Sequence, residues 1–178
     1  MAASAGDGAI YLGSFSKVLA PGLRLGYVVA PKAIFPKLLQ AKQAADLHTP
    51  GFNQRVVHEV IRDGFLREHV PTVRARYKAQ RDAMRAALEQ HLPSGCRWKT
   101  PAGGMFFWVE LPAGLDTRTL LPRAVDAGMA YVPGAPFYCR DARANTLRLS
   151  FVTVAPPEID KGVAALGRVL AEALQQQR

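Results

Sequence analysis

The sequence predicts a mixed α/β (α+β) protein built in two parts. Short apolar runs beside glycine, at residues 9–13 and 25–30, are typical of buried strands. Apolar residues then recur at helical spacing over much of the stretch from 31 to 92. After Pro93, strand-like and helix-like segments alternate, which is typical of a self-contained α+β unit. We therefore expect a division into residues 1–64 and residues 65–178.

The first part begins with the two strands at residues 9–13 and 25–30. The loop between them contains Pro21 and Gly22, a pair that marks a turn. Two buried strands cannot form a sheet by themselves, so they need neighbours that these residues do not provide.

Three helices are predicted between the second strand and Pro93. The first begins near Pro31, because proline is favoured early in the first turn. The second ends near Gly64, and the third is interrupted near Pro71, whose ring removes a backbone hydrogen bond. Their expected inward-facing residues are Ile34, Leu38 and Leu39; Val56, Val57, Val60 and Ile61; and Val73, Tyr77, Met84 and Leu88.

The second part is expected to add three strands and two helices to the long helix. Gly103 and Gly104 lead into its first strand, and Pro156 and Pro157 open its last helix. The predicted strands span residues 105–111, 130–132 and 146–152, and the predicted helices span residues 117–126 and 156–173. The last helix is expected to bury Ile159, Val163, Leu166, Val169 and Leu170.

Composition and charge argue against several classes of protein. Hydrophobic residues make up 49% of the chain and charged residues 21%, which favours a packed core over disorder. No apolar run reaches the roughly 18 residues that a membrane helix needs. The net charge of +9 could suit nucleic acid, but the basic residues of the stretch 67–85 are mixed with acids, which favours a solvated helix face.

The termini and the cysteines suggest a cytoplasmic protein. Residues 1–8 lack a basic region followed by an apolar stretch, so we do not expect a signal peptide. Cys96 and Cys139 stand far apart and outside any CxxC or Cys/His cluster, so we expect two reduced thiols and no metal site.

The stretch Ser14-Phe15-Ser16-Lys17, followed by Arg24, carries the most chemistry. A lysine at the end of a buried strand can be desolvated, and its neutral amine can then attack an aldehyde to form a Schiff base. Hydroxyls and a guanidinium on the same loop suit a phosphate, because arginine offers a bidentate fork. Pyridoxal phosphate carries both an aldehyde and a phosphate. On spacing alone, a solvated lysine on a surface loop stays an open alternative.

Residues 14–27 follow the pattern SxSKxxxPGLRxGY, which resembles the cofactor-lysine signature of the class I and II aminotransferases. These enzymes depend on pyridoxal 5'-phosphate (PLP). The resemblance implies that Lys17 is the catalytic residue that holds PLP and that Ser14, Ser16 and Arg24 bind its phosphate. It also implies the C-terminal end of a PLP-transferase large domain, followed by the complete small α+β domain.

Later segments extend the resemblance. Residues 101–112 are similar to a small-domain strand, and residues 131–137 to a turn that closes near the substrate. Residues 145–151 resemble the strand whose arginine binds the substrate α-carboxylate, a role that falls on Arg148. The motifs are most similar to those of 2-aminoadipate aminotransferase-like enzymes and of the aminotransferase-like halves of MocR-type regulators. Candidates for the border of the substrate side-chain pocket are Thr100, Phe137 and Tyr138.

The resemblance covers nearly all of the chain, which is less than half as long as a family member. The family's aspartate that pairs with the pyridine nitrogen lies upstream of the lysine strand. Asp7 lacks the surroundings of that aspartate, so the role does not pass to it. We therefore expect a C-terminal fragment that is incomplete for catalysis alone.

Three functions stay open. The first is an aminotransferase, expected to be a homodimer, in which Lys17 moves protons while an amino group passes from an α-amino acid to a 2-oxo acid. The second is the effector-binding domain of a transcription regulator, whose DNA-binding domain would lie upstream. The third is an inactive structural remnant, which would give no absorbance band with added PLP.

Overall fold

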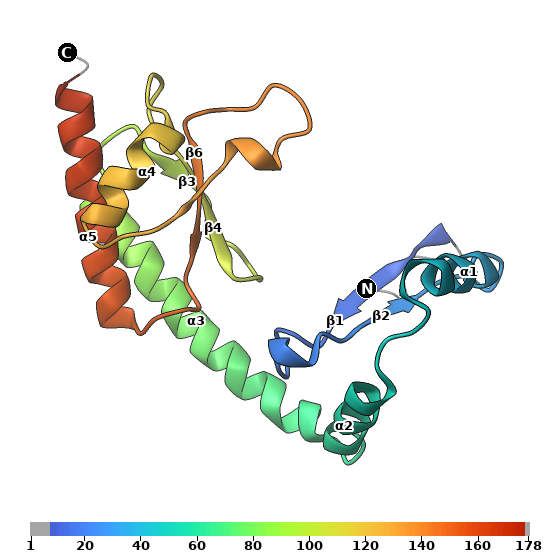
Figure 1. The fold of residues 1–178 in the computed structure, drawn as a ribbon. Coiled ribbons are helices and arrows are strands. Elements are labelled where there is room, and N and C mark those ends of the chain that lie inside the picture. Colours follow the sequence, from blue (N-terminus) through green and yellow to red (C-terminus); the bar gives the residue numbers. More distant parts are fainter. Residues whose placement is uncertain (1–7, 177–178) are drawn as a thin grey trace. The chain divides into compact units, whose positions relative to one another are not determined.

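The computed structural model describes residues 8–176 and divides the chain into two compact units, one up to Val73 and one from Arg74. Asp7 lies outside the described residues. Figure 1 shows the helices and strands of each unit.

The first unit contains a two-stranded antiparallel sheet and helices. Strand β1 (Tyr11–Ser14) pairs with β2 (Gly26–Val29), and helices α1 (Phe35–Asp46) and α2 (Gly51–Ile61) follow. Both strands were expected to be buried, and that expectation is wrong. Leu12 is 74% exposed and Val28 is 52% exposed, because β1 and β2 form a sheet that no third strand among residues 8–176 joins.

The apolar faces predicted for the first two helices are largely unburied as well. Helix α1 begins at Phe35, so Ile34 precedes it, and both Ile34 and Leu39 are exposed. In α2 only Val57 is buried. These helices present apolar residues at the predicted spacing, but the described part of their unit supplies too little surface to cover them.

Helix α3 (Phe65–His91) is continuous, so the predicted interruption near Pro71 is wrong. Proline removes one backbone hydrogen bond and crowds the carbonyl of the residue four positions earlier. Pro71 and Arg67 are both exposed, so water can reach the affected side of the helix. The stripe that ends in Met84 and Leu88 is confirmed, since both side chains are fully buried. The basic face is also solvated and carries ion pairs such as Arg85 to Glu89 at 2.8 Å.

The second unit is built on a four-stranded antiparallel sheet, with β3 (Arg97–Trp98), β4 (Phe106–Glu110), β5 (Val132–Pro133) and β6 (Thr146–Ser150) in the order β3-β4-β6-β5. Helices α4 (Thr117–Asp126) and α5 (Pro156–Gln175) complete it with the second part of α3. The two predicted helices are confirmed, α4 at its predicted bounds. The short strand lies slightly later than predicted, and β3 was not predicted.

One face of this sheet forms the core of the unit. Phe107 and Val109 of β4 alternate with the outward residues Phe106, Trp108 and Glu110, as expected for a strand buried on one side. The inner residues pack with side chains of α3, α4 and α5. The five residues predicted to face inward on α5 are all buried.

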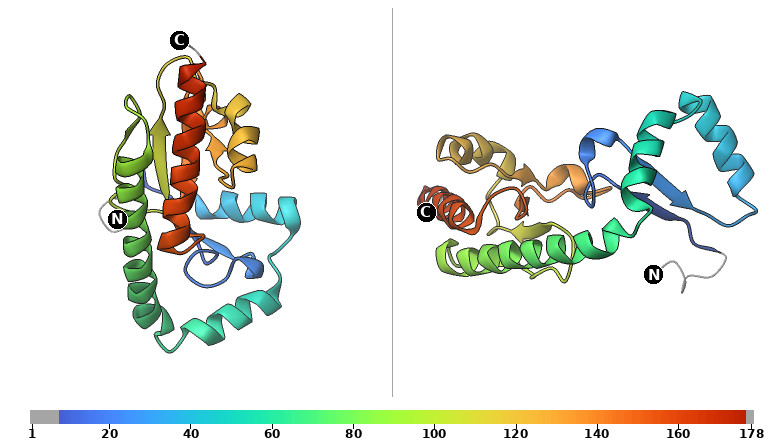
Figure 2. Two further views of the ribbon diagram at one scale, coloured as in Figure 1. Left: turned by 90° about the vertical axis from the view of Figure 1, so that its left-hand side faces the viewer. Right: turned by 90° about the horizontal axis from the view of Figure 1, so that it is seen from below.

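Helices α3 and α5 lie side by side (Figure 2). They approach so closely that a Cβ added at Gly167 would lie 2.2 Å from the carbonyl oxygen of His91. Within residues 8–176, no helix combines the length and the apolar character needed to cross a membrane.

Candidate active site

The predicted cofactor loop connects β1 to β2 in the first unit. Ser14 is the last paired residue of β1, opposite Gly26, and the amide of Phe15 extends the ladder by donating to the carbonyl of Leu25 at 3.0 Å. The amide of Leu19 then donates to the carbonyl of Phe15 at 2.8 Å. These two bonds close a tight turn at the end of the strand, and Lys17 lies in that turn.

The second half of the loop is held from both sides. A 3-10 turn at Pro21–Leu23 ends at Arg24, which adopts a left-handed conformation (φ 52°) and whose amide donates to the Pro21 carbonyl at 3.2 Å. From α2, the side-chain amide of Asn53 donates to the carbonyl of Leu23 at 3.1 Å. A left-handed arginine costs backbone energy, so these bonds fix a conformation that the sequence alone does not favour. Asn53 was not predicted, because its contact depends on the packing of α2.

The loop also requires a glycine beside the turn. A Cβ at Gly13 would come within 2.1 Å of the Tyr27 ring, which crosses over the strand between Tyr11 and Phe15. The ring centroid of Tyr27 lies 5.4 Å from that of Phe15. Gly13 therefore permits a small aromatic cluster that braces the start of the turn.

The polar side chains of the loop leave donors free. Ser14 Oγ accepts from the Ser16 amide at 3.1 Å, which keeps the serine hydroxyl proton available. Among the described residues, neither Lys17 nor Arg24 has a side-chain hydrogen bond or ion pair. The sequence from Gly13 to Gly26 contains no acid. Two cations, two hydroxyls and no competing carboxylate are a donor set that fits a phosphate and an aldehyde.

The expected desolvation of Lys17 is not found in this unit. Its side chain is exposed, as is the strand that precedes it. The reason is the same for both: β1 and β2 have no covering layer among the described residues of the first unit.

The predicted carboxylate-binding residue, Arg148, lies in the second unit at the centre of β6. It stands opposite Trp108 of β4 and Val132 of β5, on the outward face of the sheet. Its guanidinium carbon lies 4.1 Å from the ring centroid of Phe106 and 4.7 Å from that of Phe137. It forms no ion pair within the described chain.

A small pocket adjoins Arg148. Its volume is about 160 Å³, and it is lined by Phe106, Ala130, Tyr131, Val132, Arg148 and Ser150. Phe137 and Tyr138, two of the residues proposed to border the substrate side chain, both pack near Trp108 on the same face. Thr100 is exposed and lines neither this pocket nor the wider one beside Trp108.

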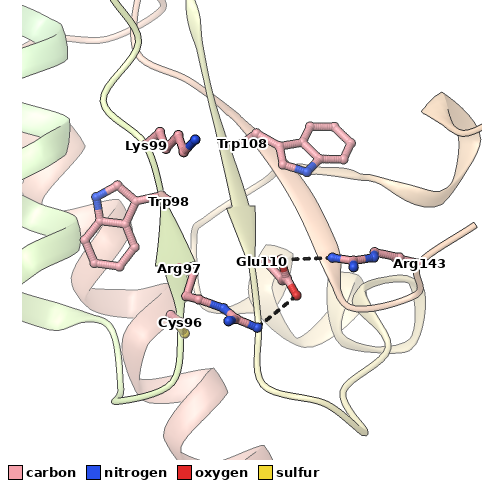
Figure 3. A pocket seen from close by; sticks show the side chains of 7 residues that line it. All are labelled: Cys96, Arg97, Trp98, Lys99, Trp108, Glu110 and Arg143. Carbon is pink, nitrogen blue, oxygen red and sulfur yellow. Dashed lines mark hydrogen bonds and ion pairs between the residues drawn. The ribbon is translucent and has the colours of Figure 1, made fainter.

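The wider pocket lies between β3, β4 and the segment that carries Arg143 (Figure 3). Its volume is about 820 Å³, and none of the predicted site residues lines it. Glu110 stands in it between two arginines, with Arg97 at 3.3 Å and Arg143 at 3.0 Å. Figure 3 shows one arginine approaching each carboxylate oxygen, so both oxygens of Glu110 are already paired.

Known proteins resemble this chain in both sequence and structure. The family model of class I and II aminotransferases matches residues 1–166. A 2-aminoadipate transaminase of Thermus thermophilus is 49% identical over 163 residues, which cover 92% of this chain and 41% of the relative. The crystal structure of LysN, an alpha-aminoadipate aminotransferase of that species in complex with N-(5'-phosphopyridoxyl)-L-leucine, is 48% identical with a TM-score of 0.91 and covers 96% of this chain and 43% of that chain.

A transcription regulator is among the relatives as well. The HTH-type regulator TauR of Rhodobacter capsulatus is 36% identical over 169 residues, covering 93% of this chain and 34% of the regulator. Both resemblances stated from the motifs are therefore confirmed, and so is the mixed helix-and-strand fold of PLP-dependent transferases. The chain spans about two fifths of the length of the aminotransferases it matches. Because the family model covers most of its residues, this chain belongs to the class I and II aminotransferases.

Proposed function

We propose that this chain is part of a PLP-dependent aminotransferase, which moves an amino group from an α-amino acid to a 2-oxo acid. The observation that carries the proposal is the loop from Ser14 to Arg24, where a lysine and an arginine without acidic partners share a turn with two serines. The phosphopyridoxyl compound in the similar LysN structure supports PLP as the group for this donor set.

The roles of the loop follow from its chemistry. PLP, when bound, supplies an electron sink for carbanion chemistry. Lys17 would hold the cofactor through its Nζ atom and then carry a proton at that atom as general acid and base. Ser14, Ser16 and Arg24 would bind the phosphate through two hydroxyls and a guanidinium fork.

Arg148 would bind the α-carboxylate of the substrate. Its free guanidinium on an outward face, beside a pocket of about 160 Å³, supports this role. Thr100, Phe137 and Tyr138 are proposed to border the substrate side chain. The same proposal assigns residues 1–64 to the end of the large domain and residues 65–178 to the small domain. It also includes a homodimer and a cytoplasmic location.

Chemical labelling tests the loop. The chain is mixed with PLP, its visible absorbance is recorded, borohydride is added, and the modified lysine is mapped by mass spectrometry. We expect one label, on Lys17, that Lys17→Ala removes and that Lys32→Ala, at an exposed lysine outside the loop, leaves unchanged. Equal labelling of several surface lysines would contradict the assignment and favour an inactive remnant.

A second function is favoured by a specific finding, the 36% identity to the regulator TauR. In that case the same loop would bind a cofactor or an amino acid as a signal. Sequencing the gene upstream of residue 1 separates the two. A helix-turn-helix domain ahead of the rest of the large domain supports the regulator, and a large domain without a helix-turn-helix domain ahead of it supports the enzyme. The higher identity to the transaminase, 49%, makes the enzyme our first choice.

A further inference from the structure

The guanidinium of Arg148 is held by aromatic faces rather than by an acid. Phe106 comes from β4, and Phe137 comes from the 3-10 turn Ala135–Phe137 that follows β5. Their ring centroids lie 4.1 Å and 4.7 Å from the guanidinium carbon. A cation over a ring face is attracted by the electrons of the ring, and the contact uses none of its N–H donors.

The only acid in the four strands of this sheet cannot compete for Arg148. That residue is Glu110, which lies on the same outward face of β4 as Trp108 and whose two oxygens are occupied by Arg97 and Arg143. An acidic partner for Arg148 would have to be displaced before a ligand carboxylate could bind. Ring faces avoid that competition, since the edge of the guanidinium stays free for a bidentate pair.

The second ring is itself braced. Phe137 meets Trp108 edge to face, with ring centroids 5.7 Å apart. The turn that carries Phe137 is tied to β6, because the amide of Gly134 donates to the carbonyl of Thr146 at 2.7 Å. Phe137 therefore has a fixed place beside Arg148, as a positioning residue requires.

We propose that Phe106 and Phe137 are positioning residues, which orient the guanidinium of Arg148 and keep its outer N–H groups free for one carboxylate. That the carboxylate belongs to an amino acid or a 2-oxo acid rests on the proposed function. The orientation of the guanidinium by the two rings does not depend on the proposed function.

Nuclear magnetic resonance of the chain with isotope-labelled arginine tests the proposal, with 2-oxoglutarate as the probe. The side-chain protons of Arg148 should lie upfield of the other arginines, because they sit over ring faces. Phe106→Leu and Phe137→Leu should each remove part of this shift and weaken 2-oxoglutarate binding at Arg148 by about fivefold. Phe137→Tyr, which keeps the ring face, should retain both the upfield shift of Arg148 and the affinity for 2-oxoglutarate. Phe52→Leu, at an exposed phenylalanine of α2, is the matched control and should change neither.

The outcomes separate the two proposals. Binding at Arg148 with the expected variant effects, but no label on Lys17, would uphold the ring contacts and defeat the assignment of Lys17 as the residue that holds PLP in this chain. Loss of binding in Arg148→Ala together with wild-type binding in both leucine variants would overturn the positioning role. An unshifted Arg148 resonance, or no response of Arg148 to 2-oxoglutarate, would overturn the proposal as well. Unfolding curves of each variant show whether a loss reflects the site or the fold.

Discussion

Replacing Gly134 by alanine should destabilise the second unit through a steric conflict at a single point. The backbone there (φ −78°, ψ −25°) suits any residue, so no conformational cost arises. The new Cβ, however, would lie 2.2 Å from the Thr146 hydroxyl oxygen and 2.8 Å from its carbonyl oxygen. Thr146 is buried, and its carbonyl also accepts from the Thr117 hydroxyl at 2.9 Å, so it cannot move without further loss. Overpacking of this kind costs about 1–3 kcal/mol.

Urea unfolding followed by tryptophan fluorescence measures the effect. Both tryptophans, Trp98 and Trp108, belong to the second unit, so the signal reports that unit alone. With a denaturant dependence of about 1.5 kcal/mol per molar, a loss of about 2 kcal/mol lowers the midpoint by roughly 1.3 M. Gly103→Ala is the matched control, because nothing lies within 4 Å of its added Cβ. Equal midpoints for Gly134→Ala and Gly103→Ala would refute the steric reasoning.

Three further predictions concern a helix contact, a thiol and the proposed ligand. Gly167→Ala should lower the same unfolding midpoint further, since its Cβ would meet the backbone oxygen of His91, which cannot rotate away; an unchanged midpoint would mean that the helices separate freely. Burial raises the pKa of the Cys96 thiol from 9.0 to about 11. The contribution of the buried thiol to the stability of the fold is therefore complete below pH 9 and is lost as the pH rises toward 11. At about pH 8, iodoacetamide should therefore alkylate the exposed Cys139 first, and mass mapping that finds Cys96 modified first would contradict this. Arg148→Ala should weaken 2-oxo acid binding by about 1.5–3 kcal/mol in calorimetry, whereas wild-type affinity would remove Arg148 from the site.

The sequence predicted the second unit well because that unit buries its own apolar pattern. Helix α4 has its predicted bounds, and Phe107 and Val109 alternate with outward residues as a half-buried strand requires. The first unit was predicted less well for the opposite reason. Apolar residues such as Leu12 and Val28 indicate surfaces that something covers, but periodicity does not say whether the cover lies in the same chain.

The candidate site residues were proposed from motifs, whereas their surroundings could not be predicted from the sequence. The pattern around Lys17 named the loop, yet the contact of Asn53 with the loop depends on how α2 packs. Likewise, Arg148 was proposed from the motif of its strand, but its contact with Phe106 depends on the pairing register of β4 and β6. Short strands such as Arg97–Trp98, with only two residues, have too little pattern for detection from the sequence.

The uncovered hairpin of β1 and β2 has a consequence for exchange kinetics. In the part of the chain that the structure describes, each of its strands has a partner on one side only, and apolar side chains on both strands face water. Local opening there needs little free energy, whereas β4 and β6 lie inside a sheet backed by a core. Amide deuterium exchange should therefore be fast from Tyr11 to Val29 and slow in β4 and β6. A partner that covers the hairpin should slow amide exchange from Tyr11 to Val29 and leave the exchange in β4 and β6 unchanged.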